Sequence, residues 1–269
     1  MKKVAILVIG ALNQPVYLHY LRTYWSTFIK YAESELSSID IYLLFERKWN
    51  LEEFSYINEH IIVDQNEDYN GLVGPKQYTS IIPGILSKTI YALELLVDHY
   101  DVFFRTNLSS MIHTSSFLNL LLSKAEIIYS GQGIWKDALR KDLIFHDRIG
   151  PDKSIKNLSE LEEYPGNSFI TGSGYFLGKK DVIDILENKH KIRYDIVDDV
   201  SIGLMIKDHE YIPNFTLKLT DHDSIEMMIQ KLRSESYSHV RLQHMKLQKA
   251  QELWDVMSSS EMLESLIYY

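Results

Sequence analysis

Apolar and polar residues alternate between strand-like and helix-like spacing along the first hundred residues. Strands are predicted at residues 3–9, 39–45, 61–64 and 101–106, and helices at 15–30 and 83–97. The first strand is an almost continuous apolar run, which is typical of a strand covered on both faces. Strands separated by helices predict an α/β fold with a Rossmann-like, mostly parallel central sheet flanked by helices. Such sheets bind ligands beyond the carboxyl ends of their strands.

The second half of the chain is less regular. Residues 131–166 carry mixed charges and two Pro-Gly or Gly-Pro steps, which predict a long surface excursion that acts as a lid or acceptor-binding segment. A small-residue turn follows at 169–178, then a helix at 180–188 and a short apolar helix that starts at Asp198 and Asp199. A basic, histidine-containing stretch at 231–249 precedes a closing helix. Without a repeat or linker, residues 1–269 are interpreted as one domain.

Composition narrows the classes of function. The net charge of −9 argues against a nucleic-acid binder. The absence of cysteine excludes disulfides and thiolate metal sites and fits a reducing compartment. The apolar run at the start is too short for a signal peptide, and no run is long enough for a transmembrane segment. A cytoplasmic protein is expected.

The carboxylate pair and the glycine turn are the leading candidates for chemistry. Asp199 or Asp198 could accept a proton from an attacking hydroxyl, although aspartate at a helix start is also an ordinary N-cap. Gly172 and Gly174 flank Ser173 and precede Tyr175, and a turn without side chains lets backbone approach a ligand.

Cationic and neutral polar residues form the second set of candidates. Arg105 offers a planar fork suited to phosphate, and Asn107 and Ser109 follow the strand that ends beside it, although a polar turn is the simpler reading. Further candidates are Lys88, His239, Arg241 and His244. His239 and Arg241 share one face of a predicted strand, where they could bind a diphosphate. Asp221 and Asp223 suggest a metal site, but a turn is favoured there.

Four segments, taken in order across residues 80–205, resemble the inverting β-1,3-glycosyltransferases of the Fringe and β-1,3-galactosyltransferase type. Ile85-Leu-Ser-Lys-Thr-Ile-Tyr-Ala92 is similar to their Leu-Thr-x-Lys-Thr helix, and Asp101 to Ser109 takes the place of their strand ending in Asp-x-Asp. Thr171-Gly-Ser-Gly-Tyr-Phe-Leu-Gly178 resembles their glycine turn. Asp198-Asp-Val-Ser-Ile-Gly203 resembles their helix start with the catalytic base.

This resemblance implies a GT-A fold with a nucleotide-sugar-binding half at 1–110 and an acceptor-binding half with a C-terminal tail at 111–269. It implies a nucleotide-sugar donor, UDP-linked, and a glycan acceptor. The family's Golgi members usually have a membrane anchor and cysteines, and their absence from this sequence leads us to expect peripheral contact with a membrane surface instead. Asp199 becomes the expected general base with Asp198 beside it, and Gly172, Ser173, Gly174 and Tyr175 line the substrate site. The implied reaction is a single displacement with inversion.

One departure from the family concerns the metal. Asn107-Leu108-Ser109 replaces Asp-x-Asp and carries no negative charge, so Mg²⁺ or Mn²⁺ should bind poorly. We expect no cofactor, with Arg105, Lys88, His239 or Arg241 supplying the charge for the diphosphate. Two alternatives stay open: a non-catalytic sugar- or nucleotide-binding module on the same fold, and a metal-dependent phosphohydrolase. The hydrolase would use the four aspartates at 198, 199, 221 and 223.

Overall fold

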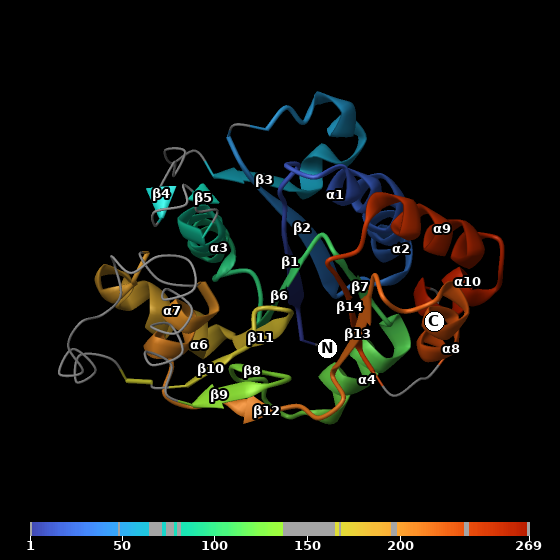
Figure 1. Ribbon diagram of the computed structural model, residues 1–269. Coiled ribbons are helices and arrows are strands. Elements are labelled where there is room, and N and C mark those ends of the chain that lie inside the picture. Colours follow the sequence, from blue (N-terminus) through green and yellow to red (C-terminus); the bar gives the residue numbers. More distant parts are fainter. Residues whose placement is uncertain are drawn as a thin grey trace.

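A seven-stranded sheet forms the centre of the molecule in the computed structural model (Figure 1). The structure describes residues 2–47, 49–64, 72–73, 78–79, 82–136, 165–166, 168–194, 198–233 and 237–267. The strands of this sheet are β1 (Val4–Ile9), β2 (Ile39–Glu46), β3 (Ile61–Asp64), β6 (Val102–Asn107), β8 (Ser130–Gly131), β11 (Tyr175–Gly178) and β12 (Glu210–Tyr211). They lie side by side in the order β12, β8, β11, β6, β1, β2, β3.

Most neighbouring strands of this sheet are parallel. β1 runs parallel to β2 and β6, β2 to β3, and β8 to β12, whereas β11 is antiparallel to both β6 and β8. The carboxyl ends of β1 and β6 therefore lie side by side, with Ile9 paired to Asn107. The predicted fold class, a mostly parallel sheet flanked by helices, is confirmed.

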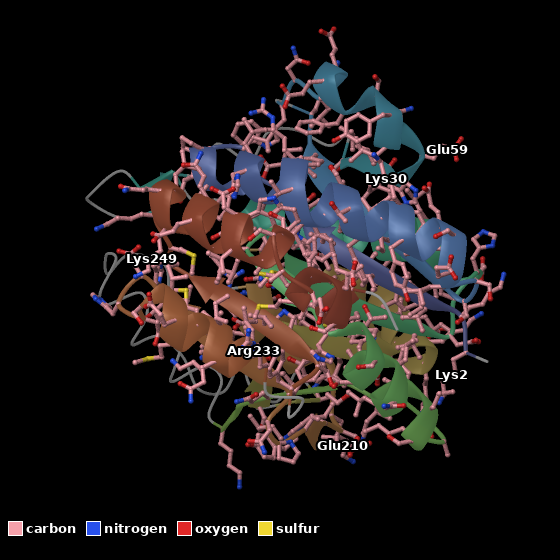
Figure 2. The ribbon with its side chains drawn as sticks, turned by 90° about the vertical axis from the view of Figure 1, so that its right-hand side faces the viewer. Lys2, Lys30, Glu59, Glu210, Arg233 and Lys249 are labelled. Carbon is pink, nitrogen blue, oxygen red and sulfur yellow. The ribbon has the colours of Figure 1, made fainter. Side chains whose placement is uncertain are left out.

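Helices cover both faces of the sheet, because successive strand residues point to opposite faces. Ile6 of β1 packs in one apolar cluster with Trp25, and its neighbour Leu7 packs in the other with Leu93. The first layer contains α1 (Pro15–Tyr20), a π-helical turn η1 (Leu21–Trp25), α2 (Ser26–Glu35), α4 (Thr114–Ser123), α8 (Ile225–Leu232), α9 (Leu247–Ser258) and α10 (Met262–Ile267). The second contains α3 (Ile82–Leu96), α6 (Lys179–Glu187) and α7 (Asp198–Met205). Figure 2 looks onto the first layer, where α9 lies beside the continuous α1–α2 helix.

A three-stranded sheet carries the C-terminal part of the chain to the carboxyl end of β6. β14 (His239–Gln243) pairs in parallel with β13 (Thr216–Thr220) and antiparallel with β7 (Ser110–Ile112), which directly follows β6. Two smaller sheets pair β9 (Ile134–Lys136) with β10 (Ser168–Ile170) and β4 (Leu72–Val73) with β5 (Tyr78–Thr79). Short 3₁₀ segments lie at η2 (Glu52–His60) and η4 (Lys189–Lys191).

The predicted elements agree closely with the structure through α3 and β6. The first helix extends past its predicted end to Glu35, and the helix expected at 180–188 is α6. The basic stretch at 231–249 is not a separate tail, since it contains the end of α8, all of β14 and the start of α9. The excursion expected at 131–166 lies largely outside the described residues, which stop at 136 and resume at 165.

Candidate functional site

A cleft of about 530 Å³ opens at the carboxyl end of β6, between the glycine turn and β14. Its volume falls in the range of pockets that hold small ligands, roughly 300–1,000 Å³. The residues that give it chemical character are Tyr17, Tyr20, Ser109, Gly172, Asp199 and Arg241. They come from α1, the turn after β6, the glycine turn, α7 and β14, so the cleft joins segments far apart in sequence. This is the edge at which the sequence predicted a ligand.

The approach of α7 to β10 places the two aspartates at the cleft. Gly203 allows this approach, because a Cβ there would lie 2.4 Å from both the Ser168 carbonyl oxygen and the Phe169 Cβ. No side chain fits in that space. The tight contact holds the N-terminal turn of α7, which begins at Asp198 and Asp199, against the glycine turn.

Asp199 is fixed by backbone donors on both carboxylate oxygens. The Gly172 N–H donates to Oδ2 at 2.8 Å, and the Val200 N–H donates to Oδ1 at 2.9 Å. Glycine at 172 matters here, since a Cβ would lie only 3.2 Å from Oδ2. The carboxylate is thereby held in one orientation at the wall of the cleft.

Burial raises the pKa of Asp199 to about 7, and the neighbouring charge of Asp198 adds to this effect. The hydrogen bond from Gly172 and the charge of Arg105 act in the opposite direction but are smaller. A carboxyl with a pKa near neutrality is well matched to general base catalysis, because it is partly ionised yet binds a proton firmly.

Asp198 forms a buried ion pair with Arg105. The Arg105 Nη2 donates to Asp198 Oδ2 at 2.5 Å, and the guanidinium lies 5.6 Å from the centre of the Tyr175 ring. Burial is the largest single influence on Arg105 and lowers its pKa, but the charges of Asp198, Tyr175, Asp199 and Tyr129, with Asp198 the largest of them, together raise the pKa above its usual value. Arg105 is buried beneath the glycine turn, so its charge serves Asp198 and is not exposed in the cleft.

Asn107 also serves the glycine turn. Its Nδ2 donates to the Gly172 carbonyl oxygen at 3.0 Å, and the Arg105 Nη1 donates to the same oxygen at 2.6 Å. Gly172 is therefore held on both sides, through its carbonyl by Arg105 and Asn107 and through its N–H by Asp199. The sequence suggested Asn107 as a residue that binds the sugar donor, and in the structure its side chain contacts the Gly172 carbonyl next to Asp199.

Arg241 stands at the opposite side of the cleft. Its Nη1 donates to the Oγ of Ser109, the last residue of the Asn107-Leu108-Ser109 segment, at 2.5 Å. Among the described residues no carboxylate forms an ion pair with it. Burial lowers the pKa of Arg241 to about 10, so the guanidinium stays charged at neutral pH. A largely desolvated cation without a counter-charge favours the binding of an anion.

Two other predicted site residues, His239 and Lys88, lie away from the cleft. His239 is fully buried, with Nε2 bonded to Thr106 Oγ1 at 2.9 Å and Nδ1 to Thr216 Oγ1 at 3.1 Å. Burial, with a smaller effect of Arg241, lowers the pKa of His239 to about 3, so the ring is neutral and does not supply charge. Lys88 is buried too, and its Nζ donates to the Gly10 carbonyl oxygen at 2.6 Å.

The rest of the glycine turn is divided between the cleft and the core. Ser173 lines the cleft beside Gly172. Gly174 lies against the buried rings, since a Cβ there would come within 3.0 Å of His239 and Phe104. Tyr175 is buried in β11, where it packs edge-on against Tyr129. Only the first half of the turn can therefore touch a ligand in the cleft.

Several cleft residues were not anticipated from the sequence. Tyr17 and Tyr20 come from α1, and Lys218 comes from β13. His244, by contrast, was one of the candidates from the sequence. It also lines the cleft and has a positive φ of 54°, an uncommon conformation for a residue other than glycine. The spacing of Tyr17 and Tyr20 places both on one side of a helix that follows the first strand, a signal that could have marked them.

No family model matches this chain, and no curated protein matches its sequence. Among solved structures, it is similar to a glycosyltransferase involved in the glycosylation of the major capsid of PBCV-1, with 8% identity, 94% of this chain and 99% of that one covered, and a TM-score of 0.47. Mouse xyloside xylosyltransferase 1 in its apo form is 11% identical, with 90% of this chain and 97% of that one covered and a TM-score of 0.44. The galactosyltransferase LgtC in complex with donor and acceptor sugar analogs is 12% identical, with 94% of this chain and 95% of that one covered and a TM-score of 0.47. All three are glycosyltransferases, but at these TM-scores they do not establish the activity of this chain.

The four aspartates proposed for a phosphohydrolase do not come together. Asp221 accepts from the Lys246 N–H at 3.2 Å, and Asp223 forms an ion pair with Lys231 at 2.5 Å in the turn after β13. Within the described ranges, no group of three or more His, Asp or Glu side chains is arranged to hold a metal ion. The arrangement gives no support to the phosphohydrolase alternative.

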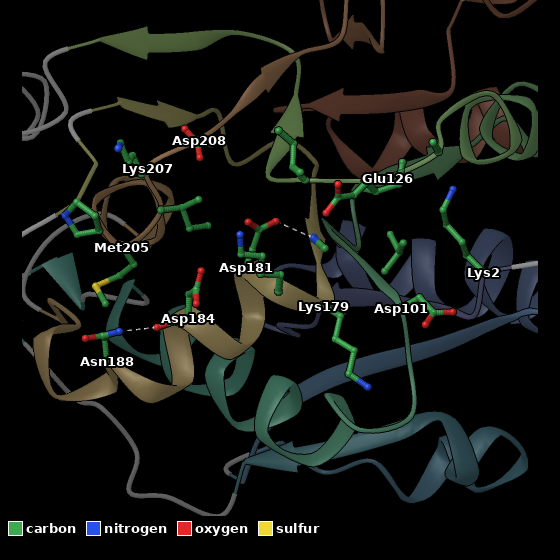
Figure 3. A pocket seen from close by; sticks show the side chains of 18 residues that line it. Lys2, Asp101, Glu126, Lys179, Asp181, Asp184, Asn188, Met205, Lys207 and Asp208 are labelled. Carbon is green, nitrogen blue, oxygen red and sulfur yellow. Dashed lines mark hydrogen bonds between the residues drawn. The ribbon is translucent and has the colours of Figure 1, made fainter.

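A larger cavity of about 870 Å³ lies at the other end of β6 (Figure 3). It is lined by Val102 at the start of β6, by Gly178 at the end of β11, and by side chains of both charges, namely several lysines and several acidic residues. Asp181 faces it and caps α6 by accepting from the Gly178 N–H at 2.9 Å, and burial raises its pKa to about 6. None of the predicted site residues lines this cavity, so the cleft is the better candidate.

No helix within the described part of the chain is long and apolar enough to cross a membrane.

Proposed function

We propose that this protein is an inverting glycosyltransferase that moves a sugar from a nucleoside-diphosphate sugar to a hydroxyl of a glycan acceptor. The observation that carries the proposal is the pairing of two groups in one cleft, the Asp199 carboxylate on one wall and the Arg241 guanidinium on the other. A base for the attacking hydroxyl and a cation for the departing diphosphate are the two charges that a single displacement needs. The sequence resemblance to β-1,3-glycosyltransferases supports the same assignment.

In the proposed reaction the acceptor hydroxyl loses its proton to the Asp199 carboxylate while its oxygen forms a bond to the anomeric carbon. The bond from that carbon to the diphosphate oxygen breaks on the opposite side, and the electron pair leaves with the diphosphate. The configuration at the anomeric carbon is therefore inverted. A diphosphate needs no proton to depart, but its growing charge is stabilised by a nearby cation, a role assigned to Arg241.

We further propose that transfer does not require a divalent cation. Asn107 and Ser109 stand where the resembling family has its acidic metal ligands, and both are engaged with the protein itself. The Arg241 guanidinium donates a hydrogen bond to Ser109, so its positive charge is fixed near the position where a metal ion would otherwise supply positive charge. The donor is proposed to be UDP-linked.

The test is a panel of nucleoside-diphosphate sugars, with release of the nucleoside diphosphate measured in the presence of glycan acceptors and EDTA. The wild type should release nucleoside diphosphate from one donor, and Asp199→Asn should lower kcat by about 10²–10⁴-fold. Asp181→Asn is a matched control, since Asp181 is another half-buried aspartate with a raised pKa but lies at the far end of β6. It should retain the wild-type rate.

Three outcomes count against the proposal. Equal activity of Asp199→Asn and wild type would show that Asp199 is not the base. Complete loss of transfer in EDTA, restored by Mn²⁺, would refute the metal-free route. Tight binding of a donor without any turnover would indicate a binding module instead of an enzyme.

A further inference from the structure

The hydroxyl of Tyr20 is a buried polar group that the fold leaves without a partner. Tyr20 is 4% exposed, and among the described residues its oxygen has no hydrogen-bond partner. Four residues further along the same helix, Tyr24 is equally buried, yet its hydroxyl accepts from the Ile112 N–H at 2.7 Å and donates to the Ile112 carbonyl at 3.2 Å. A buried hydroxyl without a partner loses its hydrogen bonds to water and gains none in return, which destabilises the folded protein. Its presence at Tyr20 therefore calls for an explanation.

The location of Tyr20 supplies that explanation. Tyr20 lines the same cleft as Arg241, and the charge of Arg241 acts on it strongly enough to oppose the effect of burial on the phenol. Burial nevertheless raises the pKa of Tyr20 far above its usual value, so the hydroxyl keeps its proton and can donate it in a hydrogen bond. Tyr20 and Arg241 thus line one cleft and interact electrostatically, and among the described residues the first has a hydroxyl without a partner and the second a charge without a carboxylate.

We propose that Tyr20 and Arg241 form a subsite for a phosphate group, in which the Tyr20 hydroxyl donates a hydrogen bond to a phosphate oxygen that Arg241 also holds. This assignment rests on the proposed function for the identity of the ligand, the diphosphate of the sugar donor. The chemistry fits because phosphate oxygens are strong acceptors that carry negative charge, and a charge-assisted bond is shorter and stronger than a neutral one. Both groups that are unsatisfied without ligand become satisfied with it.

The surroundings of Arg241 favour this assignment. Ser109 Oγ accepts from Nη1 and holds the guanidinium in place, so its remaining N–H groups keep a fixed direction. Lys218 lines the same cleft and adds a second positive charge. A preorganised donor set of this kind binds an anion without having to reorder its side chains.

The test measures binding of inorganic pyrophosphate by calorimetry in the presence of EDTA, using wild type, Tyr20→Phe and Tyr24→Phe. Tyr20→Phe removes only the hydroxyl and should weaken pyrophosphate binding about tenfold or more. It should leave the melting temperature of the ligand-free protein unchanged or higher, because the removed hydroxyl had no partner. Tyr24→Phe should do the reverse, lowering the melting temperature through loss of the Ile112 bonds while pyrophosphate binds as in the wild type.

Two results would overturn the subsite. One is wild-type affinity for pyrophosphate in Tyr20→Phe, and the other is no pyrophosphate binding by the wild type. Asp199→Asn separates this inference from the proposed function, because it should abolish transfer and still bind pyrophosphate. If the protein binds pyrophosphate through Tyr20 but transfers no sugar, the subsite is supported and the proposed glycosyltransferase activity is refuted.

Discussion

The two arginines near the cleft differ in how the fold treats their charge. Arg105 is fully buried, bonded to Asp198 and to the Gly172 carbonyl, and its charge is matched within the protein. Arg241 bonds to Ser109 and has no carboxylate partner among the described residues. The matched arginine holds a structure in place, and the unmatched one is left with charge for a ligand. Sequence alone made Arg105 look equally suited to phosphate.

The same contrast separates the two walls of the cleft. At the Asp199 wall both carboxylate oxygens of Asp199 accept backbone hydrogen bonds, so the carboxylate is held in one position. At the Arg241 wall Tyr20 and Arg241 both retain unused hydrogen-bonding capacity. Under the proposed function, the first wall positions the reacting hydroxyl, which requires rigidity, and the second receives the charge of the diphosphate, which requires unsatisfied donors.

The largest expected effect comes from removing each arginine in turn. Arg105→Met should destabilise the protein by about 3–5 kcal/mol, because Asp198 would be left as an uncompensated buried charge. Arg241→Met should change the free energy of unfolding by less than about 1 kcal/mol in the absence of ligand, since no charge partner is lost. Urea unfolding of both variants measures the difference. Equal losses would remove the distinction between the two sites.

The next effect is a dependence of stability on pH. The raised pKa of Asp199 means that the folded protein binds its proton more tightly than the unfolded chain. Its contribution therefore favours folding at low pH and is lost as the pH rises from about 4 to about 7, by up to about 1.4 kcal/mol per pH unit. Asp181 acts in the same direction with its pKa of about 6, whereas the lowered pKa of His239 favours folding as the pH rises.

The contribution of Asp199 is isolated by comparing wild type with Asp199→Asn in urea at pH 5 and pH 7.5. The wild type should lose more stability than the variant between these values. Identical changes in the two proteins would mean that the carboxyl titrates with an ordinary pKa.

The smallest expected effect concerns Asn107. Asn107→Ala removes one hydrogen bond to the Gly172 carbonyl and should cost about 0.5–1.5 kcal/mol. Asn107→Asp should cost more, because a carboxylate would face that carbonyl oxygen and add negative charge near Asp199. It should also move the pH dependence of transfer to higher pH. A stable Asn107→Asp variant that becomes dependent on Mn²⁺ would instead place a metal site at this position.

The sequence predicted the edge of the sheet at which the cleft lies because the evidence for it is local. The apolar run of β1 and the segment Asp101 to Asn107 fix two adjacent parallel strands, and ligands bind where such strands end. The carboxylate pair and the glycine turn were also recognisable as short motifs. Their contact, the bond between the Gly172 N–H and Asp199, follows from the close packing that Gly203 permits.

The roles of the cationic residues could not be predicted, because they depend on contacts between distant parts of the chain. Arg105 meets Asp198 across 93 positions, and Arg241 meets Ser109 across 132. His239 and Arg241 share a strand face, as expected, but only the structure shows that the first is enclosed by Thr106 and Thr216. Whether a charge is matched or unmatched is a property of tertiary packing.

The proposed transfer reaction depends above all on Asp199 acting as the general base. The most direct measurement is a ¹³C NMR titration of its side-chain carboxyl carbon, assigned by comparison with Asp199→Asn, which requires no knowledge of the sugar donor. For Asp199 with its raised pKa, the midpoint of the titration should lie near pH 7. A midpoint near pH 4, the ordinary value for aspartate, would contradict it.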